Sequence, residues 1–543
     1  MKLSKKANYL LIFGFLAILN VLFRFPITPH ELGADSFVMH GMANFISANG
    51  YAKWIMHPLS FFGLYPLSYP SGGIFYLSSI SQCTGIDTEY SILVVSTCLG
   101  VLGAFTTYLM AKEILDDDFF AFATAFIFSI SRVFLAYTTW TYTTRGFFIA
   151  LLPLFIWSLL RLSSSEWRGK LKYAFLAGIL FIILGASHHI VFFIPLVLIA
   201  YFIAIFLNDI KHKFKSPVSK KAIPFAFFSI FTILFLAQFT GFTIYNPSYH
   251  EFQGGYFLQG SEPHIILLNM GICYAMKTGV LIILAPVGVL SLVFKSHKRF
   301  PEIFLLVLLL CFAPFLTDSR YIPTFLAPVL SLFIGLGLIA IPNAIGKIKR
   351  IEKVTIPILM IILLFSAFLP SFVVVKKQVY LPGYTTHMAE RTYNAGLFMK
   401  EHGNGSTISN DGFINDRIKA TAGILTFEDP DKYDFSTVRR VPLSEILSKK
   451  IDTFYVIQDC YFNYLNYYTG LHWCPVMSRR YDCDRARKVL IGDNIHYAVV
   501  NNYYPTKWNN PNSGKFEDSP FLISIQKEKY KVYDDSLESI WYL

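Results

Sequence analysis

The chain has 543 residues, of which 54% are hydrophobic and 17% aromatic, while charged residues make up only 15%. Soluble domains carry about 25% charged residues, so this composition, with a mean hydropathy of +0.48, excludes an ordinary water-soluble protein and indicates a chain that lies in a bilayer. The formal net charge of +12 does not imply a nucleic-acid partner, because the basic residues are divided among separate loops at membrane level.

Apolar segments recur along the first two thirds of the chain. A run of about 20 residues suffices to cross a hydrocarbon core about 30 Å thick. We therefore predict a polytopic α-helical membrane protein with about eleven transmembrane helices in residues 1–375. The predicted spans cover 8–27, 91–111, 119–137, 146–162, 173–187, 190–207, 222–241, 272–294, 301–317, 321–342 and 354–375. The segment 173–187 is short and is consistent with a tilted or re-entrant helix.

Lys and Arg residues are divided unevenly between the two sets of loops. The N-terminus and every second loop within 1–375, except one acidic loop, are basic, whereas the opposite loops hold little beyond Lys53, Arg145 and Arg320. Because cytoplasmic loops carry the excess of positive charge, we expect a multi-pass cell-membrane protein with a cytoplasmic N-terminus and an extracytoplasmic tail. The first span lacks a small-residue cleavage site, so we interpret it as an anchor and not as a signal peptide.

The first outer loop, residues 28–90, is too long to be a simple connector. It opens with "HELGADSF", which holds Glu31 and Asp35, and residues 39–49 then have helical spacing with apolar residues toward one side. The segment "YPLSYPSGG" (65–73) interrupts regular structure. The Trp and Tyr content favours a helix and loop that lie in the headgroup region.

The tail, residues 376–543, is polar and rich in tyrosine. A helical pattern at 388–401, strand patterns at 453–458 and 495–501, and a hairpin around 534–536 predict a small extracytoplasmic α/β domain. Cys474 and Cys483 could close a short disulfide loop, although spacing alone does not fix the pairing. No cysteine or histidine pattern has the spacing of zinc ligands.

The outer loops also hold the ionisable residues that are candidates for catalysis or substrate binding. Besides Glu31 and Asp35 these are, in chain order, His40, Arg145, His188, His189, Glu262 and Arg320. A carboxylate at a membrane surface can deprotonate a hydroxyl or hold a divalent cation. An arginine can pair bidentately with a phosphate. Together these residue types are what the transfer of a group from a lipid phosphate requires.

In their order and sidedness these motifs resemble the GT-C superfamily of membrane glycosyltransferases, and in particular the catalytic subunits of oligosaccharyltransferases. Gly33-Ala34-Asp35 with His40, the helix at 39–49 and the Tyr-Pro segment follow the order of that family's first outer loop. "DSRYIPTFLAPVLSLFIGLGL" (318–338) resembles its arginine-led late span, and "GSEP" (260–263) resembles an acidic motif of a later outer loop.

The resemblance implies a GT-C fold and a sugar donor linked to polyprenyl (dolichyl) phosphate. It assigns Asp35, with Glu31 as helper, to catalysis as the base or the acid that positions the acceptor, and Arg320 to the donor phosphate. The remaining outer residues named above are then candidates for substrate binding, and Asp35 with Glu262 could hold Mg²⁺ or Mn²⁺. Against these roles, Asp35 could merely cap a helix, and the arginines could be interface anchors.

Two departures from oligosaccharyltransferases narrow the expected activity. Their second acidic motif has no counterpart in "TTWTYTTRGFF" (138–148), and the tail lacks their Trp-Trp-Asp-Tyr-Gly signature. These departures favour the related GT-C enzymes that use dolichyl-phosphate monosaccharides and often work without metal. We expect such a transferase to act with inversion on a glycan, lipid or protein acceptor. A divergent metal-dependent oligosaccharyltransferase-like enzyme is one alternative. A transporter or lipid-handling protein is another, although transporters place ionisable residues near the bilayer midplane.

Overall fold

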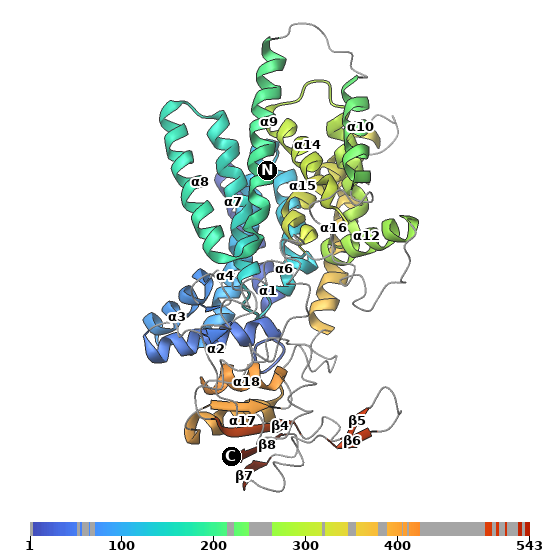
Figure 1. The fold of residues 1–543 in the computed structure, drawn as a ribbon. Helices are drawn as coiled ribbons and strands as arrows, with labels where there is room; N and C mark the ends of the chain where they lie inside the picture. The colour runs from blue at the N-terminus through green and yellow to red at the C-terminus, as the bar shows by residue number, and fades with distance from the viewer. Residues whose placement is uncertain are drawn as a thin grey trace, which may run out of the picture. The chain divides into compact units, whose positions relative to one another are not determined.

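Figure 1 shows the computed structural model of the chain, which we describe as two compact units. The first comprises Met1–Pro26, Ser96–Thr139 and Thr144–Tyr380, and the second comprises Ile27–Val95, Trp140–Thr143 and Leu381–Leu543. The structure describes residues 4–50, 55–56, 64–65, 71–213, 222–237, 263–317, 321–345, 355–377, 388–403, 406–409, 412–423, 495–501, 507–509, 516–518, 530–534 and 538–542. Arg320, Glu262, Cys474, Cys483 and the predicted strand 453–458 lie outside these ranges.

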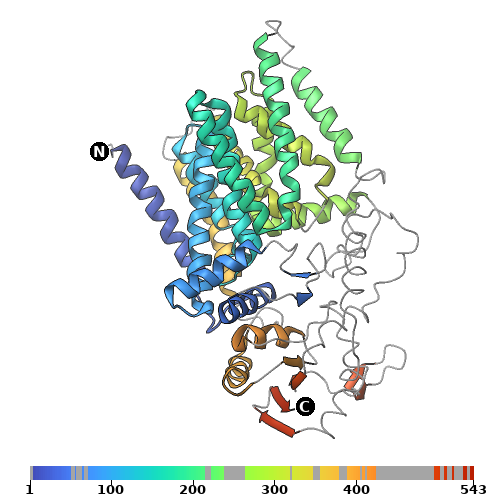
Figure 2. The ribbon, with the colours of Figure 1, turned by 60° about the vertical axis from the view of Figure 1, so that its left-hand side comes forward.

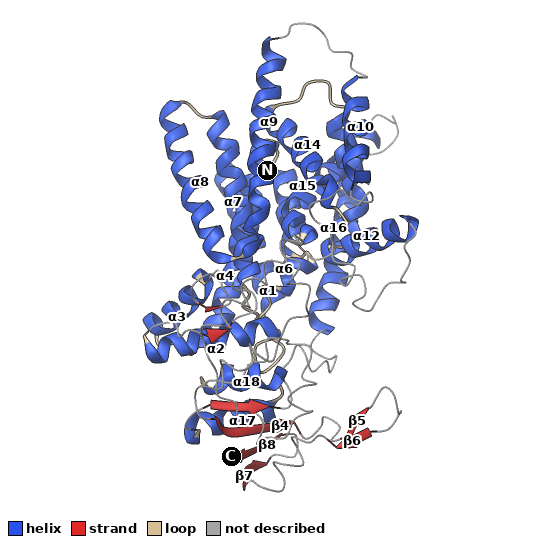
Figure 3. Ribbon diagram, viewed as in Figure 1, coloured by secondary structure: helices blue, strands red, loops and turns tan. Residues whose placement is uncertain are grey.

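In its described residues the first unit is entirely helical (Figure 3). Only helices satisfy all backbone hydrogen bonds within one segment, as a lipid environment demands. The helices are α1 (Lys5–Arg24), α4 (Thr88–Ile114, which begins in the second unit), α5 (Asp118–Ser129), α6 (Arg132–Ala136), α7 (Thr144–Ser164), α8 (Trp167–Ser187), η1 (His189–Phe193), α9 (Ile194–Lys213), α10 (Ala222–Ala237), α12 (Pro263–Thr278), η2 (Val280–Leu284), α13 (Ala285–Val293), α14 (Phe300–Phe312), η3 (Ala313–Phe315), α15 (Ile322–Ile345) and α16 (Thr355–Lys377).

Every predicted span coincides with one or more of these helices, which confirms a polytopic helical membrane protein. Within the described residues, six helices are long and apolar enough to cross a bilayer, or seven if one bent pair is counted as a span. The count of about eleven therefore stays a prediction. The α8 helix is longer than predicted, since its charged first turns extend back to Trp167. It pairs with α7 through a short turn (Figure 2).

Two predicted spans are broken. The segment 272–294 bends by 118° between α12 and η2, where Gly279 has a φ of +100° that residues with a Cβ rarely adopt. The segment 119–137 is interrupted after α5, because Ser131 is extended. Hydropathy carries no information on backbone angles, so both breaks were invisible to the span prediction.

Small residues let two of these helices approach closely. Gly288 of α13 lies against the carbonyl oxygen of Phe333, and Gly337 of α15 lies against that of Leu284, so neither site has room for a Cβ. Contacts of this kind replace the hydrophobic driving force that is missing between helices in lipid. Aromatic rings fill the neighbouring space, with Phe312 stacked on Phe325 at a centroid distance of 5.3 Å.

The second unit combines helices with short strands. Its first part holds α2 (Ala34–Asn49), β1 (Ile55–Met56), β2 (Leu64–Tyr65) and α3 (Gly72–Thr84), and its last part holds α17 (Glu390–His402), β3 (Ser406–Ser409), α18 (Gly412–Ala422), β4 (Ile495–Asn501), β5 (Lys507–Asn509), β6 (Phe516–Asp518), β7 (Tyr530–Asp534) and β8 (Glu538–Tyr542). One sheet has the order β3-β4-β8-β7, in which β3 and β4 are parallel and the other pairs antiparallel.

Several sequence predictions for this unit are confirmed. The predicted helix at 388–401 is α17, the predicted strand 495–501 is β4, and the terminal hairpin is the antiparallel pair β7–β8. The helix predicted at 39–49 is α2, which begins five residues earlier, at Ala34. The polar residues of "ADS" belong to its first turn, where an acidic side chain interacts favourably with the positive end of the helix dipole.

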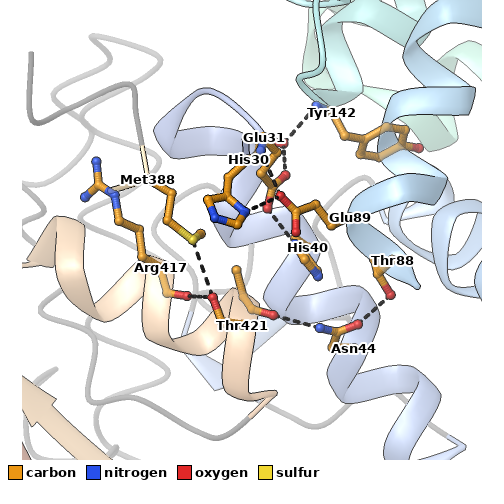
Figure 4. Close-up of polar contacts among 12 residues, drawn as sticks. His30, Glu31, His40, Asn44, Thr88, Glu89, Tyr142, Met388, Arg417 and Thr421 are labelled. Atoms are coloured by element: carbon orange, nitrogen blue, oxygen red, sulfur yellow. Dashed lines mark hydrogen bonds and ion pairs between the residues drawn. The ribbon is translucent and has the colours of Figure 1, made fainter. Parts of the chain in front are cut away.

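Contacts on two sides hold α2 in place. It packs on α18, where Gly41 lies against the aliphatic stem of Lys419 and the guanidinium of Arg417 lies 5.1 Å from the ring centre of Phe37. Asn44 donates to the carbonyl oxygen of Ala420 at 2.8 Å and accepts from the hydroxyl of Thr88 at 2.5 Å (Figure 4). The helix that carries Asp35 is therefore tied to both α18 and the start of α4.

Candidate active site

Asp35 lies in the first turn of α2 and is exposed. The chain enters the helix through Gly33, whose φ of +96° is strained for any other residue. Asp35 is thus an accessible carboxylate at the N-terminal end of α2, and its catalytic role stays a prediction.

Glu31, only four residues earlier, has the opposite environment. Its side chain is fully buried. One carboxylate oxygen accepts the hydroxyl of Ser36 at 2.6 Å, and the other lies 2.5 Å from Nδ1 of His40 (Figure 4). Burial disfavours a charged His40, but the Glu31 carboxylate outweighs it and raises the pKa of His40 above its ordinary value of 6.5. The two candidates Glu31 and His40 form a buried ion pair beneath the start of α2.

His30 forms a second acid–base cluster in the same unit. Its Nδ1 lies 3.1 Å from Glu89 and its Nε2 lies 3.1 Å from Glu390 of α17, while its ring stacks on Tyr393 at 3.9 Å. A neutral imidazole would turn one lone pair toward a carboxylate, so this geometry requires the cation. Burial opposes the charge, yet hydrogen bonds and charge from both glutamates raise the pKa of His30.

The segment 140–143 belongs to this unit although α7 follows it directly. Trp140 accepts the backbone N–H of Leu32 at 2.9 Å, and its indole N–H donates to the backbone oxygen of Glu89 at 3.3 Å. Tyr142 donates its backbone N–H to the Ser36 hydroxyl at 2.9 Å and its phenol to the carbonyl oxygen of Gly73 at 2.5 Å. The segment that lacks the second acidic motif is therefore bound firmly to the first outer loop.

In the first unit, three predicted substrate-binding residues lie together. The Arg145 guanidinium lies 5.5 Å from the ring centre of Tyr137 and 5.7 Å from that of Tyr321, and the His189 ring meets Tyr321 edge-on at 5.3 Å. The His188 and His189 rings are 4.0 Å apart. The structure thus joins residues from three separate chain segments into one cluster, which we call the Arg145 cluster.

His188 is the buried histidine of the Arg145 cluster. Nδ1 of His188 accepts the backbone N–H of Ile190 at 3.0 Å, so this nitrogen carries no proton. Burial, together with the charges of His189 and Arg145, lowers the pKa of His188 well below its ordinary value. The permanent positive charge of the Arg145 cluster therefore resides on the arginine.

The described residues do not assemble a metal site. Among them, no group of three or more His, Cys, Asp or Glu side chains is placed to hold an ion. Of the two predicted ligands, Asp35 is described and Glu262 is not, while both oxygens of Glu31 are already engaged. The predicted pair of metal ligands, Asp35 and Glu262, therefore stays a prediction.

Sequence reasoning missed Arg24, at the last turn of α1. Its guanidinium is fully buried and donates to Thr138 Oγ1 at 2.7 and 3.1 Å and to Asn20 Oδ1 at 2.7 Å. It also lies 5.0 Å from the ring centre of Phe134. A charge inside the predicted span 8–27 was a visible signal, since ionisable residues within a membrane span call for a partner. His30 and Glu89 were missed as well, although His30 opens the quoted motif.

No protein-family profile matches the chain, and no curated protein matches it significantly. Among solved structures, the oligosaccharyltransferase AglB of Archaeoglobus fulgidus, in complex with an inhibitory peptide and a dolichol-phosphate, is similar with a TM-score of 0.57 at 13% identity, covering 96% of this chain and 75% of that one. The A. fulgidus oligosaccharyltransferase tethered to an acceptor peptide gives 0.56 at 14% identity, covering 92% and 69%.

ArnT of Cupriavidus metallidurans, bound to undecaprenyl phosphate, is similar over almost the full length of both chains. The TM-score is 0.51 at 11% identity, and the match covers 99% of this chain and 98% of that one. Identities this low establish the fold alone. The resemblance seen in the sequence is confirmed at that level, and the chain has the fold of the GT-C membrane glycosyltransferases.

Proposed function

We propose that the protein is an integral membrane glycosyltransferase that moves a sugar from a polyprenyl (dolichyl)-phosphate-linked donor to an acceptor at the outer membrane face. The observation that carries this proposal is the exposed carboxylate of Asp35 in the first turn of α2, at the position where the family resemblance expects the catalytic acid. The fold supports it, since two similar structures hold a dolichol-phosphate and an undecaprenyl phosphate.

In the proposed reaction, Asp35 accepts the proton of an acceptor hydroxyl as that oxygen attacks the anomeric carbon of the donor sugar. The bond between the anomeric carbon and the phosphate oxygen breaks, and the polyprenyl phosphate leaves with the bonding electron pair. Attack opposite the leaving group inverts the anomeric configuration. A positioned general base contributes about 10²–10⁴-fold to such a step.

The donor phosphate is assigned to the arginines of the outer face. Arg145 lies near two tyrosine rings, and one of its nitrogens donates to the Tyr137 hydroxyl at 3.4 Å. These contacts restrict the guanidinium, whose remaining N–H groups are suited to phosphate binding. Arg320 directly precedes Tyr321 of the Arg145 cluster in the chain, and we assign it to the same phosphate. His188 and His189 would line this subsite, and Glu262 would contribute to substrate binding, whereas His40, predicted as a substrate-binding residue, is buried in the ion pair with Glu31. We also assign the tail to an extracytoplasmic α/β domain.

The test is the transfer of labelled sugar from a panel of polyprenyl-phosphate donors by the purified protein in lipid nanodiscs. Asp35→Asn should lower kcat by about 10²–10⁴-fold. Glu401→Gln, which changes an exposed acid of α17, is the matched control and should keep wild-type turnover. Equal turnover by Asp35→Asn and wild type would remove Asp35 from catalysis.

A second candidate, a metal-dependent oligosaccharyltransferase-like activity, is favoured by the similarity to the A. fulgidus enzyme. Chelation of divalent cations and an acceptor peptide as substrate separate the two functions. Transfer to a hydroxyl acceptor that survives chelation supports the proposed function. Transfer to a peptide that is abolished by chelation supports the second candidate.

A further inference from the structure

Glu31 cannot meet a substrate where it lies. Its side chain is fully buried, and its two carboxylate oxygens are engaged by the Ser36 hydroxyl at 2.6 Å and by His40 at 2.5 Å. Its own backbone N–H donates to Glu89 at 3.0 Å. A carboxylate with both oxygens committed inside the protein can orient its neighbours, but it is not placed to exchange a proton with a sugar.

The neighbour that Glu31 orients is Ser36. The Ser36 hydroxyl gives its single proton to Glu31 and therefore turns a lone pair toward the backbone N–H of Tyr142, which donates to it at 2.9 Å. Glu31 thus determines which way the hydroxyl points. Without that acceptor, the hydroxyl would be free to rotate and the buried N–H of Tyr142 would lose its fixed partner.

The segment 140–143, whose Tyr142 donates this bond, contains an unusual backbone conformation. Trp140 has a φ of 41°, in the left-handed region that non-glycine residues rarely adopt. Backbone in this region persists when the surroundings over-determine it, and such residues gather at functional sites. Here the surroundings are the bonds from Leu32, Ser36 and Gly73 to the segment 140–143.

We propose that Glu31 is a positioning residue for the transfer reaction. Itself held by His40, Glu31 fixes the Ser36 hydroxyl, which clamps the segment 140–143 to the first turn of α2 and so holds the carboxylate of Asp35 in place. The kinetic part of this inference rests on the proposed function. The clamp itself does not, because it is a property of the folded second unit. Asp35 neighbours Ser36 in the chain, so any rotation of the first turn that breaks the Ser36 bond also moves the Asp35 carboxylate.

The kinetic experiment compares three single variants and one double variant in the sugar-transfer assay. Glu31→Gln keeps an acceptor for Ser36, and its amide N–H₂ group meets Nδ1 of His40, which becomes an acceptor once the carboxylate that raises the pKa of His40 is gone. We therefore expect kcat to stay within about tenfold of wild type. Glu31→Ala and Ser36→Ala each break the clamp and should lower kcat by about 10²-fold, the effect of misplacing a catalytic group by about 1 Å. The KM for the donor should stay within about threefold, and the double variant should be no worse than Glu31→Ala.

The second measurement needs no activity. Amide hydrogen exchange of the Tyr142 peptide in the full-length protein should accelerate by about tenfold or more in Glu31→Ala and Ser36→Ala, since a fixed partner protects the N–H. Ser47→Ala, which removes a half-buried hydroxyl near the other end of α2, is the control. It should change neither the exchange rate nor kcat.

Three results overturn the inference. Glu31→Gln as inactive as Asp35→Asn would make Glu31 an acid or base in its own right. Wild-type kcat in Glu31→Ala would remove its positioning role, and unchanged exchange at Tyr142 in Ser36→Ala would remove the clamp. If wild-type protein transfers no sugar from any polyprenyl-phosphate donor, the proposed function fails, while the exchange experiment still decides the clamp.

Discussion

Replacing Gly100 with alanine tests how the first unit accommodates a buried arginine. A Cβ at Gly100 of α4 would overlap the guanidinium of Arg24, which cannot move away because it is fully buried and bonded to Thr138 and Asn20. Alanine gains about 1 kcal/mol in helix propensity. Against this stand about 1–3 kcal/mol of overpacking and about 1.5–3 kcal/mol for each hydrogen bond lost from the charged group.

The expected net effect of Gly100→Ala is a loss of about 2–5 kcal/mol in the free energy of unfolding. Arg24→Met should cost less, since apolar residues of similar size often replace buried ionic groups at little cost. The assay is a denaturant titration in mixed micelles with a double-mutant cycle. The methionine variant should rescue Gly100→Ala, with a coupling energy of about 1.5 kcal/mol or more. Additive effects of the two substitutions would refute the packing argument.

Two further predictions concern ionisation and phosphate binding. The pKa of His30 is raised by Glu89 and Glu390, so the stability from this bridge should be complete below the ordinary value of 6.5 and be lost as the pH rises through the folded value. The protection factors of the α17 amides, which are corrected for the intrinsic base catalysis of exchange, should therefore fall at alkaline pH in wild type and stay constant over that range in His30→Gln. Arg145→Lys keeps the charge but loses the planar fork and the guanidinium contacts with Tyr137 and Tyr321. The donor KM should then rise by about tenfold while that for the acceptor stays unchanged. Equal donor KM values in steady-state kinetics would exclude Arg145 from the phosphate site.

The sequence predicted where helices lie far better than where they bend. Hydropathy locates apolar segments reliably because a bilayer accepts little besides helix, and each predicted span coincides with helix. The bends at Gly279 and after α5 depend on single backbone angles, which a window average cannot register. The strand 495–501 and the final hairpin were predictable because alternation and turn residues are local signals.

The acid–base contacts were less accessible to sequence reasoning, because their partners are remote in the chain. His30 meets Glu89 across 59 positions and Glu390 across 360. Nothing local distinguishes His30 from a solvated loop histidine. The Arg145 cluster is a partial exception, since topology alone assigned its members to one membrane face, although not to mutual contact.

The two carboxylates of "HELGADSF" show what a sequence pattern leaves open. Residues four apart would share a helix face if both were helical, and the two acids would then act as equivalent members of one site. Gly33 prevents this, because its φ of +96° starts the helix after Glu31 and before Asp35. One acid is consequently buried against Ser36 and His40, and the other is exposed at the head of α2. A single glycine thereby divides the motif into an accessible carboxylate and the buried carboxylate that supports it.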